Sequence, residues 1–147
     1  MKKKFLLIGV LFVLFSCHEK TKDSTTTTIS QTVNYNNYKS NLSFLIEDNT
    51  SDIFLNTDYL IELEGNPSTG YWWYYTIGDN TIIKNIDSKT FDFHSGEFIV
   101  GAPIIGIWKF KCLKIGETKI TFKYYRSWEG EDSASETKIF NIKVKSF

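Results

Sequence analysis

Apolar and polar residues alternate along most of the chain after residue 40, with the period of two that a half-buried β-strand produces. The first clear run places Tyr59, Ile61 and Leu63 on one face of a strand. Two later rows of alternate apolar residues are Ile120, Phe122 and Tyr124, and Phe140, Ile142 and Val144. Weaker strands, rich in aromatic and β-branched residues, are expected at 42–47, 71–77, 81–86, 90–93 and 107–113. Because no long segment in this part has apolar residues at helical spacing, the pattern predicts an almost all-β domain.

Clusters of Gly, Asn, Asp and Ser separate these runs and predict turns. They fall at 49–52, 65–70, 78–80, 95–96, 101–106, 114–117 and 129–135. About seven short strands at this spacing predict an all-β fold, an immunoglobulin-like two-sheet β-sandwich. The terminal strand, residues 138–145, carries lysines on its polar face, which would protect it if it lay at a sheet edge.

The beginning of the chain has a different pattern. Three lysines precede the uncharged run Phe5 to Phe15, as in a secretory signal. The run is too short to span a bilayer as a helix, which needs roughly 20 residues. It ends at Leu14-Phe15-Ser16-Cys17, which resembles the bacterial lipobox, in which Cys17 becomes the lipidated first residue of the mature protein. An ordinary signal peptide with cleavage nearby is the alternative.

A polar stretch follows Cys17 and includes four consecutive threonines, Thr25 to Thr28. It has too little apolar surface to offset the entropy of ordering, so it is interpreted as a tether. We therefore expect a lipoprotein signal peptide at 1–16, a lipidated Cys17 with a polar tether across 17–40, and one domain at 41–147. The corresponding location is the bacterial cell envelope, on its periplasmic or surface side, with the membrane bound through Cys17.

Charge and cysteine content narrow the function classes. The chain has 17 basic and 17 acidic residues, and loss of the three leading lysines leaves 14 against 17. This slightly negative balance argues against a nucleic-acid partner. Of the two cysteines, a lipidated Cys17 would leave Cys112 without a disulfide partner in the chain. Cys112 is in phase with Trp108 and Phe110, so it is interpreted as a core residue rather than a nucleophile.

Catalytic and metal-binding patterns are sparse in the sequence. His18 lies in the expected tether, and His94 follows Phe93 with no metal-ligand neighbour at useful spacing. The sequence has no phosphate-cradling glycine loop before a helix and no calcium-loop pattern. We therefore predict that the protein is not an enzyme and has no metal site and no cofactor. A catalytic pair of carboxylates, as in glycosidases, is the one alternative that the sequence leaves open.

The segment Gly65–Gly70 stands out between two strand patterns. Pro67 fixes its own φ, and Gly70 can take a positive φ, so the loop is expected to be stiff. It presents the hydroxyls of Ser68 and Thr69 on a preorganised tip, and rigidity lowers the entropy lost on binding. Without other information, a tight structural turn is the commoner interpretation.

The segment Tyr125–Gly130 leaves the alternating pattern before a very polar stretch. Arg126 and Trp128 are of the residue types that dominate binding hot spots, because each combines a large contact area with a polar or cationic group. The alternative is that Trp128 folds back and caps the sandwich.

In their order and spacing these two segments, with Gly101–Gly106 between them, resemble the chagasin family, the inhibitors of papain-family cysteine peptidases. The family carries an Asn-Pro-Thr-Thr-Gly-aromatic motif in its first loop, here Asn66 to Tyr71, with Trp73 matching a further aromatic residue. Its last loop carries Arg-Pro-Trp, one residue and Gly, here Arg126 to Gly130 with Ser127 in place of the proline. The resemblance covers residues 42–147.

The middle segment, Gly101–Gly106, departs from the family pattern. Gly101 and Ala102 align with a Gly-Xaa-Gly-Gly motif, whereas Pro103 and Ile104 occupy positions where the family has glycines. Ile104 and Ile105 are interpreted either as core residues or as an exposed wedge.

The resemblance implies a monomeric, reversible, tight-binding inhibitor whose three loops line up at one end of the sandwich and enter the peptidase cleft as a wedge. It places Thr69 nearest the catalytic pair of the peptidase. The implied peptidase-binding residues are Asn66, Pro67, Ser68, Thr69, Gly70, Tyr71, Gly101, Ala102, Ile104, Arg126 and Trp128.

A second hypothesis is a lipid-anchored immunoglobulin-like module that binds an envelope protein or a carbohydrate without inhibiting a peptidase. The position of the aromatic residues distinguishes the two. A carbohydrate platform would expose Trp72, Trp73 and Tyr75 on a sheet face, whereas an inhibitor needs its three loops at one end.

Overall fold

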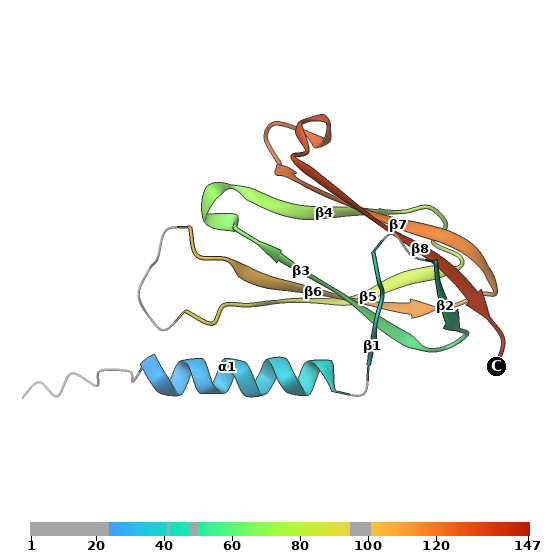
Figure 1. Cartoon of the computed structure of the whole chain (residues 1–147), viewed down its shortest axis with the longest axis horizontal. Coiled ribbons are helices and arrows are strands. Elements are labelled where there is room, and N and C mark those ends of the chain that lie inside the picture. Colours follow the sequence, from blue (N-terminus) through green and yellow to red (C-terminus); the bar gives the residue numbers. More distant parts are fainter. Residues whose placement is uncertain (1–23, 41, 48–49, 95–100) are drawn as a thin grey trace, which may run out of the picture.

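Two four-stranded β-sheets make up the body of the protein. The computed structural model describes residues 24–40, 42–47, 50–94 and 101–147, so the predicted signal peptide and Cys17 lie outside the described residues. The first sheet has the order β1-β3-β6-β5 and the second β2-β8-β7-β4 (Figure 1). The first contains β1 (Ser43–Phe44), β3 (Asp58–Gly65), β6 (Ile104–Cys112) and β5 (Ile83–Phe91). The second contains β2 (Thr50–Phe54), β8 (Glu136–Lys145), β7 (Gly116–Arg126) and β4 (Tyr71–Ile77). The predicted immunoglobulin-like sandwich is confirmed.

The core lies between the two sheets and includes the three predicted rows of alternate residues, of which Tyr124 is only partly buried. The first sheet buries Tyr59, Ile61, Leu63, Ile83, Trp108, Phe110 and Cys112. The second buries Ile53, Trp73, Ile120, Phe122, Phe140, Ile142 and Val144. Aromatic rings interlock across the interface, since Phe122 meets Trp108 edge to face with centroids 4.9 Å apart. Cys112 is fully buried, as expected for a core residue.

Strand pairing differs from the sequence prediction at three places. Residues 50–54, partly predicted as a turn, form β2 and pair in parallel with β8, so β8 lies inside its sheet and not at an edge. The two separate strands expected at 81–86 and 90–93 are one strand, β5, because a bulge between Asn85 and Asp87 shifts the alternation by one residue. β6 begins at Ile104, inside the predicted turn at 101–106, because Ile104 pairs with Gly65 of β3.

Residues 24–39 correct the prediction of a polar tether, because they form the helix α1 (Ser24–Lys39). Figure 1 shows α1 lying along the first sheet, with its first turn at the same end of the molecule as the loop after β3. The tyrosines Tyr35 and Tyr38 pack on buried Leu60, Phe91 and Ile107. The helix is therefore ordered by tertiary packing of two aromatic residues and not by a broad apolar stripe. No helix in the described ranges is long and apolar enough to cross a membrane.

Candidate functional site

The first loop, residues 66–70, is a single turn of 3₁₀ helix, η1 (Pro67–Thr69), closed by local hydrogen bonds. The Thr69 amide donates to the Asn66 carbonyl oxygen at 3.1 Å, and the Gly70 amide donates to the Pro67 carbonyl at 2.9 Å. Gly70 has φ +86°, a conformation that a residue with a Cβ rarely adopts. The side chains of Pro67, Ser68 and Thr69 are exposed. The first loop is therefore a closed, hydrogen-bonded turn with its three central residues exposed.

The hydroxyl groups of this loop are used inside it. Thr69 Oγ1 donates to the Asn66 carbonyl oxygen at 2.7 Å, and Ser68 Oγ donates to Asn66 Oδ1 at 2.6 Å. The backbone amide of Asn66 in turn donates to the Tyr124 hydroxyl at 2.8 Å. This bond ties the loop to β7 of the second sheet. Asn66 thus organises the whole turn, because its backbone and side chain each bind another residue.

Two tryptophans of β4 support the base of the loop. Trp73 is 4 % exposed, and its indole nitrogen donates to the Glu64 carbonyl oxygen at 2.8 Å. The ring of Trp72 lies against Gly65, where a Cβ atom would be 2.6 Å from the ring, so only glycine fits. The loop therefore extends from a packed base and does not depend on its own hydrogen bonds alone.

The middle loop, described at residues 92–94 and 101–103, meets the first loop at Gly101. The Asn66 side-chain amide donates to the Gly101 carbonyl oxygen at 2.8 Å, and the Gly101 amide donates to Ser68 Oγ at 3.0 Å. Ala102 is half-buried, and Ile104 is half-buried at the first position of β6. Ile104 is thus a strand residue at the edge of the loop surface and not part of a free wedge.

The last loop, residues 127–135, includes the turn η2 (Glu131–Ser133) and meets the first loop through Arg126 and Trp128. Arg126 Nε donates to the Thr69 carbonyl oxygen at 3.1 Å, and its Nη1 lies 3.1 Å from the Glu129 carboxylate. The guanidinium also stacks 4.5 Å from the ring centroid of Tyr71. Trp128 is 69 % exposed. It therefore does not cap the core.

These contacts bring nine of the eleven predicted residues together at one end of the sandwich, whereas Ala102 and Ile104 lie beside them. We call the surface formed by Asn66 to Tyr71, Gly101, Arg126 and Trp128 the tip. It combines a rigid backbone turn, an exposed indole and a guanidinium held by an aromatic ring and a carboxylate. Such a surface can bind a partner at low entropic cost, since its groups are already ordered.

Two titratable groups pair in the loop after β5. His94 Nδ1 lies 2.9 Å from Asp92 Oδ1, and the His94 amide donates to the same oxygen at 2.9 Å. The hydrogen bond from the His94 backbone, with the imidazole contact, lowers the pKa of Asp92. His94 thus lies in a loop after β5, as predicted. Among the described residues, no group of three or more His, Cys, Asp or Glu side chains could hold a metal ion.

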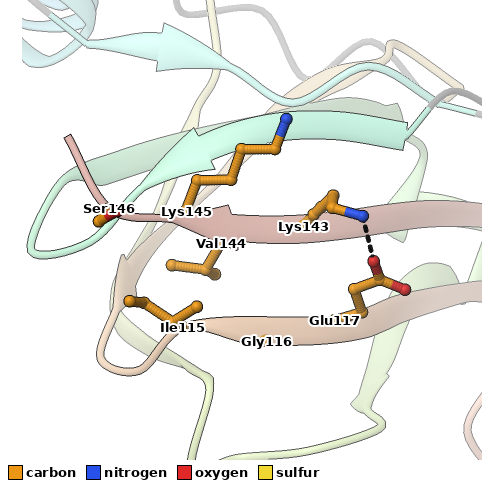
Figure 2. A pocket seen from close by; sticks show the side chains of 7 residues that line it. All are labelled: Ile115, Gly116, Glu117, Lys143, Val144, Lys145 and Ser146. Carbon is orange, nitrogen blue, oxygen red and sulfur yellow. Dashed lines mark hydrogen bonds and ion pairs between the residues drawn. The ribbon is translucent and has the colours of Figure 1, made fainter.

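A shallow depression, shown in Figure 2, is lined by residues next to the C-terminus, which lies at the other end of the sandwich in Figure 1. Its lining includes Ile115, Gly116 and Val144, and an ion pair between Glu117 and Lys143 borders it. Because it lies opposite η1, it is not part of the tip.

Sequence comparison decides the family. Residues 53–144 match the model of the chagasin family of peptidase inhibitors, I42. The chain belongs to this family. The chagasin family match begins within β2, so α1 lies outside it.

Relatives of the chagasin family resemble the chain in sequence and fold. Amoebiasin-2 from Entamoeba histolytica is 36 % identical over 96 residues, which cover 65 % of this chain and 77 % of that protein. The crystal structure of the cysteine protease inhibitor EhICP2 from Entamoeba histolytica has 25 % identity and a TM-score of 0.62, over 71 % of this chain and 96 % of that chain. The solution structure of Amebosin has 25 % identity and a TM-score of 0.51, over 71 % and 98 % of the two chains.

Sequence reasoning missed two residues that shape the tip. Tyr124 was assigned to a core row, but its hydroxyl binds the Asn66 amide. Glu129 was an unassigned position between Trp128 and Gly130, but its carboxylate holds Arg126. The spacing of three residues between Arg126 and Glu129 is a signal that could have suggested their ion pair.

Proposed function

We propose that this protein is a reversible, tight-binding inhibitor of papain-family cysteine peptidases and that its tip blocks the active-site cleft. The observation that carries the proposal is the joining of the three loops of a chagasin-family chain into one surface. Asn66 binds Gly101 of the middle loop, and Arg126 binds Thr69 from the side of the last loop. The three loops thus present one continuous face to a partner.

The mechanism follows from the stiffness of the first loop. A peptide bond is cleaved when it is held in line with the attacking nucleophile, in a near-attack geometry. The 3₁₀ turn at Pro67–Thr69 holds its peptide bonds in a closed, hydrogen-bonded conformation instead of an extended one. The turn therefore fills the cleft without offering an extended bond for attack. By the family resemblance, Thr69 lies nearest the catalytic cysteine and histidine of the peptidase.

The other tip residues supply contact area around this turn. The exposed indole of Trp128 would lie on an apolar or aromatic wall of the cleft, since large aromatic side chains dominate binding hot spots. Arg126 supports it, because its guanidinium lies 6.0 Å from the Trp128 ring centroid. Gly101 and Ala102 would make backbone contacts, and half-buried Ile104 would add apolar contact at the edge.

The carbohydrate-platform hypothesis is not favoured. It requires Trp72, Trp73 and Tyr75 on an exposed face, but Trp73 is buried, and Trp72 and Tyr75 pack against the core. Tyr75 meets Phe110 edge to face with ring centroids 5.6 Å apart. These rings therefore stabilise the fold instead of forming a binding platform.

We also propose that the protein is exported as a lipoprotein, anchored in the bacterial cell envelope through Cys17 and monomeric. The support is the signal-like run Phe5 to Phe15 followed by Ser16-Cys17. Mass spectrometry of the mature N-terminus tests this. A lipid adduct on Cys17 supports the anchor, and an unmodified N-terminus produced by cleavage elsewhere contradicts it.

Steady-state inhibition assays test the proposed function. The assay uses residues 24–147 with papain and a cathepsin L-type peptidase, and trypsin serves as the control enzyme. We expect competitive inhibition of both cysteine peptidases at submicromolar protein, full recovery of activity on dilution, and no inhibition of trypsin. No inhibition of any papain-family enzyme at micromolar protein would contradict the proposal.

A further inference from the structure

Helix α1 holds the first residues of the middle loop. The ring of Tyr35 meets the ring of Phe91 at 5.2 Å and that of Phe93 at 5.1 Å, both edge to face. Phe91 is the last residue of β5, and Phe93 is two residues into the loop. The contact therefore reaches from the strand into the loop itself.

A hydrogen bond extends this contact to the backbone. The Asp92 amide donates to Gln31 Oε1 of α1 at 3.1 Å, directly after the ladder of β5 ends. The Asp92 carboxylate in turn accepts the His94 amide at 2.9 Å. The chain from Phe91 to His94 is thus held by α1 and by a local turn between Asp92 and His94.

Polar contacts in the C-terminal half of α1 fix the position of the helix on the sheet. The Tyr35 hydroxyl donates to Glu62 Oε1 at 2.8 Å, and Lys39 pairs with the other oxygen of Glu62 at 2.7 Å. The Tyr38 hydroxyl donates to Asp87 Oδ2 at 3.0 Å. Because these bonds join the helix to both β3 and β5, a shift of α1 along the sheet would break all three.

We propose that α1 is a positioning element for the peptidase-binding loops and that Gln31 and Tyr35 are its positioning residues. They fix the beginning of the middle loop, while Asn66 and Ser68 fix its end at Gly101. The helix lies outside residues 53–144, the region matched to the chagasin family. This inference rests on the proposed function, because its effect on affinity requires that the tip binds a peptidase.

The middle loop of this chain has a particular need for such support. Its Pro103 and Ile104 stand where the family pattern has glycines, so its backbone cannot approach a partner as closely there. A loop that binds through fewer backbone contacts depends more on being ordered before it binds, since ordering costs affinity. α1 supplies such contacts to the first described residues of the loop, Asp92 and Phe93.

Two variants of the full chain test the inference, Gln31→Ala and Tyr35→Ala, with Asn34→Ala as the matched control. Asn34 is exposed on the same helix, and its substitution removes a side-chain amide as Gln31→Ala does. We expect Tyr35→Ala to raise the inhibition constant for papain by about five- to tenfold and Gln31→Ala by about threefold. Asn34→Ala should leave the constant unchanged.

Amide hydrogen exchange separates loop positioning from a general loss of stability. In Gln31→Ala, which removes one exposed hydrogen bond and keeps the aromatic contacts, exchange at Asp92 and His94 should become faster. Exchange at core amides of β7 should stay as in the parent protein. If both Gln31→Ala and Tyr35→Ala fold and inhibit papain with the parent constant, the inference is overturned.

The inhibition and exchange measurements together distinguish the proposed inhibitor function from the proposed positioning role of α1. If the parent protein inhibits no papain-family enzyme, the proposed function fails, and the exchange measurement alone decides the positioning role. Faster exchange at Asp92 and His94 then supports that α1 orders the loop, and unchanged exchange overturns it.

Discussion

The indole of Trp128 lies directly on Gly70. A Cβ atom at Gly70 would be 2.0 Å from Cη2 of Trp128, which is far inside van der Waals contact. Trp128 nevertheless stays 69 % exposed, so one side of its ring rests on the first loop and the rest is open to a partner. The missing side chain of Gly70 therefore sets the position of the largest exposed group of the tip.

Gly70→Ala tests this contact, and Gly130→Ala is its matched control. Both glycines have a positive φ, +86° and +82°, but a Cβ at Gly130 has no atom within 4 Å. Gly70 is left-handed helical (ψ −10°) and Gly130 is extended at positive φ (ψ 167°), and we expect each substitution to lower the free energy of unfolding by about 1–3 kcal/mol, because of backbone strain. Only Gly70→Ala should also weaken papain inhibition, since it displaces Trp128. If the two variants lost inhibition equally, the position of the Trp128 ring on Gly70 would have no effect on peptidase binding.

Trp128→Ala should weaken peptidase binding by about 2 kcal/mol or more, as removal of an aromatic hot spot does. Because the side chain is largely exposed, the free energy of unfolding should change by less than about 0.5 kcal/mol. Inhibition constants and urea denaturation measure the two effects. Ser127→Ala, at the exposed neighbouring position, serves as the control and should inhibit like the parent protein. A parent-like inhibition constant for Trp128→Ala would remove this residue from the binding surface.

Asn66→Ala should uncouple the middle loop from the first. It removes the donor to the Gly101 carbonyl and the oxygen that orients Ser68, the acceptor of the Gly101 amide. We expect faster hydrogen exchange at the Gly101 amide and a loss of binding of about 1 kcal/mol, the usual net value of one hydrogen bond. Unchanged exchange at Gly101 would mean that the bridge does not order the loop.

Cys112 should be unreactive in the folded protein. Burial, with a smaller contribution from the charge of Asp58, raises the pKa of its thiol to about 11. In residues 24–147 it is the one cysteine, so a thiol reagent reports on it alone. At pH 8 we expect no reaction with Ellman's reagent in buffer and one equivalent of thiol after denaturation. Rapid reaction in buffer would contradict the buried position.

The docking of α1 should weaken at alkaline pH. Burial, followed by the hydrogen bond and charge of Asp87, raises the pKa of Tyr38. Burial alone would lower the pKa of Lys39. The hydrogen bonds and charge interactions that Lys39 makes with Glu62 and Tyr35 together have a larger effect, so its pKa is raised as well. A group whose pKa is higher in the folded state than in the unfolded state stabilises the fold. This stabilisation is complete below the unfolded-state pKa of about 10, and it is lost as the pH rises through the folded-state pKa.

Unfolding free energies between pH 8 and pH 12 measure this effect. Tyr38→Phe removes one of the titrating groups and keeps the ring, so its stability should fall less steeply above pH 10 than that of the parent protein. Identical slopes for the two proteins would show that Tyr38 does not couple pH to stability.

The sequence predicted those features that depend on local pattern. The rows Tyr59–Leu63 and Phe140–Val144 follow the period of the pleat, and the first loop is defined by its own Pro67 and Gly70. By contrast, β5 contains a bulge, which breaks the alternation that the prediction used. Features set by distant partners could not be read from local pattern.

Helix α1 shows this limit most clearly. Its sequence is polar and threonine-rich, and its order comes from contacts with Phe91 and Glu62, which lie far along the chain. The spacing of Gln31, Tyr35 and Tyr38 places them on one helical face, which in hindsight is a weak signal of docking. Likewise, the hydroxyl of Tyr124 binds Asn66 only because two strands bring them together.

The central claim is that the tip occupies the peptidase cleft, and a calorimetric titration tests it most directly. Papain is titrated with residues 24–147, once with an open cleft and once after a small epoxide inhibitor has alkylated the catalytic cysteine and filled the cleft. We predict one-to-one binding to the open enzyme and no measurable binding to the filled one. Equal binding to both forms, or no binding to open papain, would contradict occupation of the cleft.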